Sequence, residues 1–184
     1  MKLYMILLGA MPLGRKIEQH DIFFGIAEHL RDLVPAINAA WPEASGRIHI
    51  DGWREVNYVD GFAVRVEEKT GAMDRESKTR LFFINLGGYK ENEFEEFHYK
   101  MIVAGENKGI AVQRAKETAF YKHTGFQHAP SHIDDRYGVD VDDAFEIEDI
   151  LPTELKQQYA VVLSPAENAQ QDAVHLGYYI LDKL

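Results

Sequence analysis

The most constraining feature of this sequence is an internal repeat. The segment that begins at Leu3 recurs at Leu81, and the offset between the two copies (81 − 3 = 78) also pairs His20 with His98. Matches at a constant offset over such a length are typical of gene duplication and fusion. Two copies are too few for a solenoid, so we expect two similar units related by a pseudo-twofold axis.

The repeat continues beyond the first segment with a changed offset. His49–Asp51 reads "HID", and the same three letters return at His132–Asp134 with a larger offset (132 − 49 = 83). The larger offset predicts a five-residue insertion in the second copy. Acidic and aromatic residues then continue to match after the "HID" segments.

Apolar patterning predicts the elements of each copy. The first copy begins with a strand at Leu3–Leu8, followed by a helical stripe from Ile17 to Val34 and a short helix from Pro35 to Trp41. Strands at 48–50, 55–59 and 62–67 follow, with Asp60 and Gly61 as a hairpin turn. The second copy predicts a strand at 81–86, helices near 93–104 and 108–122, and a hairpin of 138–141 with 144–149.

This order predicts an α+β fold of two tandem β-α-α-β-β repeats, with helices packed on mixed sheets. We expect a first repeat unit at residues 2–68, a polar linker at 69–79 and a second repeat unit at 80–151. Residues 152–184 are expected to form a C-terminal β extension. Its two predicted strands, 159–163 and 177–181, would complete the sheet of the second unit.

Composition excludes several classes of function. The 184 residues carry a formal net charge of −10, so this acidic chain is expected to bind neither nucleic acid nor anionic membranes. Its lack of cysteine excludes disulfides and thiolate metal sites and favours a cytoplasmic location. No apolar run approaches the ~20 residues that a membrane-spanning helix needs.

Histidine and aspartate recur together in both copies. On an extended segment, the two residues of an "H-x-D" pair face the same side, and His20 and His98 are the natural third members. The candidate ligand-binding residues are His20, His49, Asp51, His98, His132 and Asp134. Such residues suit a ligand pocket, an acid–base pair or a metal site, but histidines on an apolar stripe are more often hydrogen-bonded core residues. Because no third metal ligand is certain, we expect no metal and no cofactor.

Basic and acidic segments supply weaker candidates. Arg15 and Lys16 follow a G-x-x-x-x-G spacing ahead of the expected helix, but they replace the lysine and the Ser or Thr that a P-loop requires. They remain candidates for a simple anion site at a helix N-terminus. The acidic stretch Asp134–Asp149 does not match an EF-hand, since Phe145 stands where glycine is needed, so a solvated strand face is expected.

The segments "LLG", "IEQHD", "LGGYKENEFEEFHY" and "SHIDDRYGVDVDD" resemble a bacterial domain-of-unknown-function family, numbered 1543. The resemblance covers nearly the whole chain. It implies a bacterial origin and a duplicated α+β fold in which the domain occurs in one or two copies. It implies no activity, cofactor or substrate.

Two functions remain open from the sequence. The leading hypothesis is a non-enzymatic binding or interaction module, expected to form a homodimer and to bind an unknown protein or small molecule. The alternative is an enzyme that uses a His/Asp acid–base pair in a cleft between the repeats. The module is favoured because the sequence contains no complete catalytic constellation and no cofactor motif.

Overall fold

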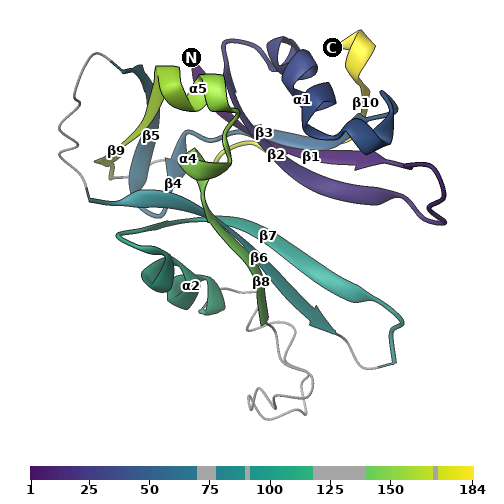
Figure 1. The fold of residues 1–184 in the computed structure, drawn as a ribbon. Helices are drawn as coiled ribbons and strands as arrows, with labels where there is room; N and C mark the ends of the chain where they lie inside the picture. The colour runs from purple at the N-terminus through teal and green to yellow at the C-terminus, as the bar shows by residue number, and fades with distance from the viewer. Residues whose placement is uncertain (70–77, 90–91, 118–139, 168–169) are drawn as a thin grey trace. The chain divides into compact units, whose positions relative to one another are not determined.

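The computed structural model describes residues 1–69, 78–89, 92–117, 140–167 and 170–184. The chain divides into two compact units (Figure 1). Unit 1 comprises Met1–Glu76 together with Ile150–Leu184, and unit 2 comprises Ser77–Asp149. Among the described residues, none of the helices combines the length and apolar character that crossing a bilayer requires.

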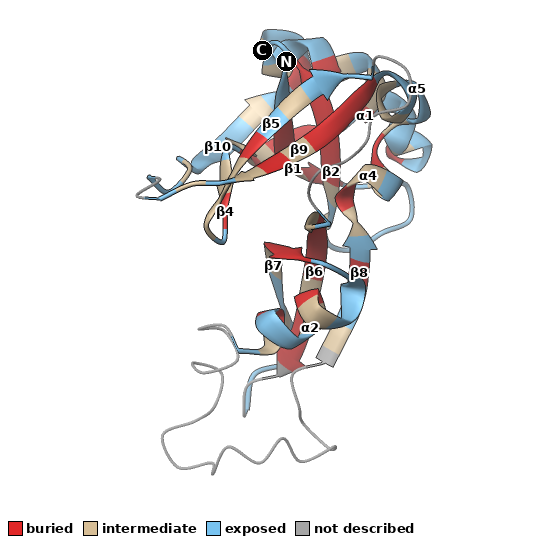
Figure 2. Cartoon of the chain, turned by 90° about the vertical axis from the view of Figure 1, so that its left-hand side faces the viewer, coloured by how far each residue is buried: buried red, intermediate tan, exposed pale blue. Residues whose placement is uncertain are grey.

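Unit 1 contains a four-stranded sheet with the order β10-β3-β1-β2. Its strands are β1 (Lys2–Ala10), β2 (Gln19–Ala27), β3 (His49–Glu55) and β10 (His175–Ile180). Each neighbouring pair is antiparallel. Strand β1 is central and almost wholly buried (Figure 2), as expected of a continuous apolar run paired on both edges.

Short helices between β2 and β3 cover one face of this sheet (Figure 1). They are η1 (Leu30–Leu33), α1 (Val34–Ala40) and η2 (Pro42–Ala44), and a final turn, η3 (Leu181–Lys183), ends the chain. Ile37 of α1 is fully buried in the same apolar cluster as Ile6 and Ile50. The predicted short helix from Pro35 to Trp41 is therefore confirmed with a boundary shift of one residue.

A second, three-stranded sheet of unit 1 has the order β4-β5-β9. It consists of β4 (Tyr58–Val59), β5 (Phe62–Glu68) and β9 (Tyr159–Pro165), and α5 (Thr153–Gln158) leads into β9. Asp60 and Gly61 adopt positive φ angles of 49° and 88°, as a two-residue hairpin turn requires, so the predicted turn is confirmed.

The C-terminal extension belongs to unit 1. Strand β10 pairs with β3, and β9 pairs with β5 along its full length. The expectation that this extension completes the sheet of the second unit is therefore wrong. Strand β9 pairs with the edge of β5 that faces away from β4, through seven consecutive residue pairs.

Unit 2 is a three-stranded antiparallel sheet with the order β7-β6-β8. Its strands are β6 (Arg80–Tyr89), β7 (Glu96–Gly105) and β8 (Asp140–Glu146). Helix α2 (Lys108–Lys116) packs on one face through Ala111 and Ala115. The short helix α4 (Ile147–Ile150) lies at the point in the chain where unit 2 ends and unit 1 resumes.

Two segments predicted as helices are strands. The stripe from Ile17 to Val34 contains β2, and the segment near 93–104 contains β7. Both are rich in β-branched and aromatic residues, and short apolar runs of this kind suit a buried strand as well as a helix. Gly25 within β2 disfavours a helix and lies so close to Leu33 that a Cβ atom there would collide with that side chain.

The α+β class holds, but the other details of the predicted repeat differ. The sheets are antiparallel rather than mixed in every strand pairing that the structure describes. The second predicted hairpin is also wrong, because Asp140–Glu146 forms one strand through the expected turn. The predicted helix near 108–122 is present as α2 over its first nine residues.

The two units nevertheless share a three-stranded frame. Strands β2-β1-β3 and β7-β6-β8 have the same order, and the first offset holds through both hairpins: Gly9 lies opposite His20, and Gly87 lies opposite His98. The third strands also share an irregularity. A bulge at Asp51 interrupts the β1–β3 register, and Asp142 occupies the same place between β6 and β8.

These bulges correct the second offset. The equivalent of Asp51 is Asp142, at an offset of 142 − 51 = 91, and not Asp134. His132 and Asp134 lie outside the described residues. The two "HID" segments have the same amino-acid sequence, but strand pairing shows that the structural equivalent of Asp51 is Asp142, in the acidic segment that forms β8.

Candidate functional site

A cluster of polar side chains forms where three strands of unit 1 meet at Gly9. The register places His20 of β2 and His49 of β3 on either side of Gly9 in β1. Residues directly opposite in antiparallel strands project to the same face. Because Gly9 has no side chain, the side chains of His49 and Asp51 can lie over it. A Cβ atom at this position would collide with His49 Nε2 and Asp51 Oδ2.

The bulge brings Asp51 to the same place. Leu7 pairs with Gly52 and Leu8 pairs with Ile50, so Asp51 is the extra residue in β3. A bulge lets two consecutive residues of one strand face a single residue of its partner, and it re-aims their side chains. Ile50 meanwhile stays fully buried in the core on the opposite face, which anchors this segment of β3.

Glu18, just before β2, completes the cluster. Its Oε2 lies 3.5 Å from His20 Nε2, and its Oε1 lies 3.2 Å from His49 Nε2. Asp51 makes the same two approaches, with Oδ2 3.3 Å from His20 Nε2 and Oδ1 3.1 Å from His49 Nε2. The two carboxylates therefore lie between the two imidazoles.

Two atoms of this cluster are sealed from solvent without a hydrogen-bond partner. They are His49 Nε2 and Asp51 Oδ2, and the His49 side chain is only 7% exposed. Leaving such groups unsatisfied costs roughly 1–3 kcal/mol each. The cluster therefore contains a buried nitrogen and a buried carboxylate oxygen that make no hydrogen bond to the described protein groups.

The spacing of the atoms distinguishes two explanations. Charged N–H···O hydrogen bonds are typically about 2.7–2.9 Å long. Two ligand atoms bound to one tetrahedral ion with bonds of about 2.1 Å lie about 3.4 Å apart. The separations of 3.5 and 3.3 Å from His20 Nε2 to the carboxylates of Glu18 and Asp51 match the second arrangement. Glu18, His20 and Asp51 each place one ligand atom within 4.8 Å of the others, as a metal site requires.

Strand β10 borders the cluster. The ring of Tyr178 lies against His49, with 4.2 Å between ring centroids, while 69% of Tyr178 stays exposed. The neighbouring His175 ring stacks on Trp53 at 4.0 Å. The C-terminal extension thus shields the His49 imidazole, which helps to explain why a histidine at this position is buried.

Unit 2 repeats the cluster in part. Glu96, His98 and Asp142 also place three ligand atoms within 4.8 Å, and His98 Nε2 lies 3.4 Å from Asp142 Oδ2. Asp142 is more exposed than its equivalent Asp51, at 33% against 24%, whereas His98 is 36% exposed and its equivalent His20 is 43% exposed. Asp140 stands at the strand position of His49, opposite Gly87.

A lysine also distinguishes the second cluster. Lys100 lies two residues beyond His98 on β7 and pairs with Asn85, so its position projects to the face of the cluster. Partial burial lowers the pKa of Lys100 from its ordinary value. Ile22 occupies the equivalent position in unit 1, at the same offset (100 − 22 = 78).

The structure brings together three of the residues predicted as ligands, His20, His49 and Asp51. His98 lies in the second cluster. His20 and His98 were expected on apolar helix stripes, but both lie on strands and are partly exposed. Glu18, Glu96 and Asp142 also belong to the clusters, and the one sequence signal for any of them is the constant offset that pairs Glu18 with Glu96.

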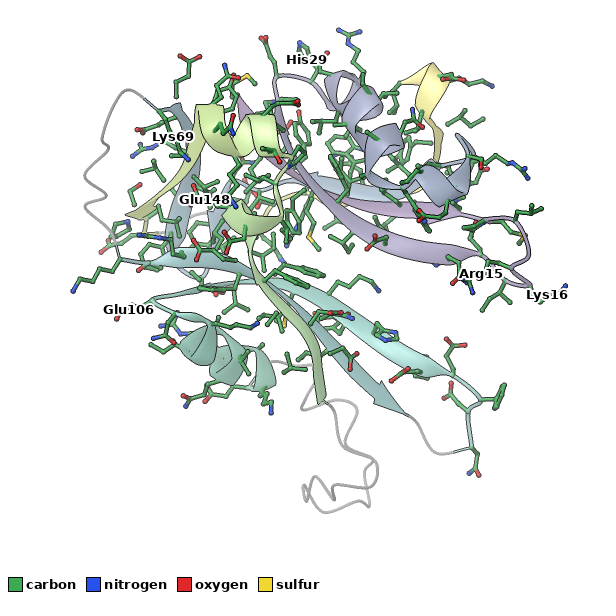
Figure 3. All side chains as sticks on the ribbon, in the orientation of Figure 1. Arg15, Lys16, His29, Lys69, Glu106 and Glu148 are labelled. Carbon is green, nitrogen blue, oxygen red and sulfur yellow. The ribbon has the colours of Figure 1, made fainter. Side chains whose placement is uncertain are left out.

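Arg15 and Lys16 lie on the exposed turn between β1 and β2 (Figure 3). The segment that follows them is strand β2, not a helix. The helix dipole on which their predicted anion site depended is therefore missing. Anion binding by these two residues stays a prediction without that support.

Comparison with known proteins confirms the resemblance seen in the sequence over one segment of the first copy. The family model described as Domain of Unknown Function (DUF1543) matches residues 15–66, a segment that contains Glu18, His20, His49 and Asp51. No curated protein matches the chain. The crystal structure of the protein Il1583 from Idiomarina loihiensis is similar in fold, with a TM-score of 0.65 and 20% identity over 98% of this chain and 97% of that chain.

Proposed function

We propose that this chain, which carries a DUF1543 segment at residues 15–66, is a binding module for a divalent transition-metal ion. Glu18, His20 and Asp51 bind the ion in unit 1, and His49 holds the two carboxylates from the buried side. One observation carries the proposal: Asp51 Oδ2 is buried without a hydrogen bond in a cluster where the distances from His20 Nε2 to the two carboxylates match those between ligand atoms around an ion.

The ligand atoms indicate the class of ion. The cluster offers imidazole nitrogen and carboxylate oxygen, and the chain has no cysteine. Imidazole favours zinc, iron, nickel and copper over magnesium and calcium, which prefer oxygen ligands. Two carboxylates would also neutralise a divalent ion. The expectation of no metal depended on the lack of a certain third ligand, and Glu18 now supplies one beside His20 and Asp51.

Zinc binding tests the proposal directly. Titration calorimetry and elemental analysis after dialysis should give about one tightly bound zinc ion per chain. Asp51→Asn keeps the shape of the side chain but removes its charge, so zinc affinity should fall at least ~100-fold. Asp142→Asn is the matched control at the equivalent bulge of unit 2, and it should change zinc affinity less than ~3-fold.

Two results would contradict the proposal. One is a wild-type protein that binds zinc no more tightly than a weak surface site, which would make the cluster a network of contacts between histidines and carboxylates alone. The other is an equal loss in both aspartate variants, because that would place the site elsewhere. Circular dichroism of each variant shows whether its fold is intact.

The same proposal includes the setting expected from the sequence. We propose a bacterial cytoplasmic protein, which the absence of cysteine supports. A homodimer is proposed as well, and light scattering on the purified protein measures it. The alternative function, an enzyme that uses a His/Asp acid–base pair in a cleft between the repeats, stays a prediction.

A further inference from the structure

The proposed metal site has three protein ligands, which come from two strands of the four-stranded sheet or their ends. Glu18 precedes β2, His20 lies on β2, and Asp51 occupies the bulge of β3. Among the described residues, the group of side chains spaced to hold one ion here consists of these three and does not include His49. Zinc bound by three protein ligands keeps a fourth position for water or an external molecule. Six-coordinate ions would keep more.

The exposure of the side chains shows which side stays open. His20 and Glu18 are 43% and 42% exposed, whereas Asp51 is 24% and His49 is 7% exposed. The cluster is therefore closed beneath, at His49, and accessible beside His20 and Glu18. A free coordination position on that side would face solvent.

The charge of the site indicates the class of external ligand. A divalent ion and the carboxylates of Glu18 and Asp51 sum to zero charge, so an approaching anion meets no net repulsion from the cluster. Arg15 and Lys16 stand on the turn that leads to Glu18, within three residues of it in sequence. These are exposed positive charges in a chain of net charge −10, and they favour an anion over a cation on this side.

We infer that the ion bound by Glu18, His20 and Asp51 keeps a coordination position open to solvent and takes up a small anion there. This inference depends on the proposed metal site and extends it. The site then differs from a structural zinc site, in which protein ligands fill every position. The protein presents a metal-bound anion on the side of the cluster where His20 and Glu18 are exposed, at the β2 edge of the four-stranded sheet.

Cobalt substitution tests this inference. Cobalt(II) replaces zinc in nitrogen and oxygen sites, and its visible absorption reports the ligands and their geometry. Titrating the cobalt-loaded protein with azide should change the absorption spectrum in a saturable way, with one azide per bound cobalt ion. Asp142→Asn should show the same azide response as the wild type.

The outcomes separate this inference from the proposed function. If cobalt binds at one ion per chain but azide leaves its spectrum unchanged, the coordination positions are filled and the inference is wrong, while the metal site stands. If no cobalt binds, both proposals are wrong. An unchanged azide response in Asp51→Asn would show that the anion binds cobalt elsewhere, which also overturns the inference.

Discussion

The two clusters differ although their backbones correspond. Unit 1 and unit 2 share strand order, hairpin register and an aspartate at a β-bulge, and each cluster contains a glutamate and a histidine at the same offset. The residues around these shared groups have changed between the units: His49 corresponds to Asp140, Ile22 to Lys100, and Leu7 to Asn85.

This difference indicates which of the two three-stranded frames is better suited to bind a cation. In unit 1 the buried His49 lies against both carboxylates, and apolar Ile22 stands nearby on β2. In unit 2 a positively charged lysine takes the place of Ile22, and its charge opposes a cation by Coulomb repulsion. Burial and surroundings, rather than the three ligand types alone, therefore assign the proposed site to unit 1.

The largest expected effect tests the shared frame itself. Ile6 and Ile84 are equivalent, fully buried residues of the two central strands. Truncating either to alanine should lower the free energy of unfolding by about 2–5 kcal/mol, because each leaves a cavity in its own core. Chemical denaturation measures both variants. A cost below about 1 kcal/mol in only one unit would break the comparison, since the two cores would then not be equivalent.

The next effect concerns the residue that most distinguishes the clusters. His49→Asp gives unit 1 the residue type of unit 2 at this strand position. It removes the imidazole that holds Glu18 and Asp51 and adds a third carboxylate to a buried place. Zinc affinity should fall ~10- to ~100-fold, the usual range for residues that orient metal ligands.

The matched control for this change is His29→Asp. His29 is exposed between β2 and η1 and contacts neither carboxylate of the cluster in the described structure. Its substitution should leave zinc affinity within ~2-fold of the wild type. If His49→Asp bound zinc as tightly as the wild type, His49 would not position the ligands, and the contrast between the units would lose its main cause.

A smaller effect is expected at the glycines beneath the clusters. A Cβ atom at Gly9 would meet His49 Nε2 and Asp51 Oδ2, whereas the three atoms nearest to a Cβ atom at Gly87 all belong to the carboxylate of Asp142. Gly9→Ala should therefore displace two groups of the proposed site and weaken zinc binding by roughly 10-fold. Gly87→Ala should not change zinc binding. Unfolding of both variants is measured alongside, and equal zinc affinities in two folded variants would contradict the proposed position of the ion.

The sequence predicted the duplication and part of the cluster for clear reasons. A constant offset preserves strand register, so the equivalence of His20 and His98 followed directly. Helix and strand could not be separated in β2, because a buried strand and an amphipathic helix share short apolar runs. The partner of Asp51 was misassigned because a bulge depends on strand pairing, which similarity of letters does not report.

The smallest expected effect concerns Lys100. Its partial burial lowers its pKa below the ordinary value of 10.5 and makes the charged form unfavourable in the folded protein. Lys100→Ile introduces the residue that unit 1 has at Ile22. It should raise the free energy of unfolding at pH 7 by about 0.5–1 kcal/mol, because it removes the cost of desolvating the charged amine and adds buried apolar surface. Chemical denaturation provides the comparison, with Lys108→Ile as a control at an exposed lysine of α2.

The pH dependence sharpens this last prediction. A base with a depressed folded-state pKa contributes stability above its unfolded-state pKa, and this contribution is lost as the pH falls through the folded-state value. Wild-type stability should therefore rise, from this group, as the pH approaches 10.5 from below, and the advantage of Lys100→Ile should shrink over the same window. An advantage that stays constant as the pH rises toward 10.5 would show that burial does not lower the pKa of Lys100.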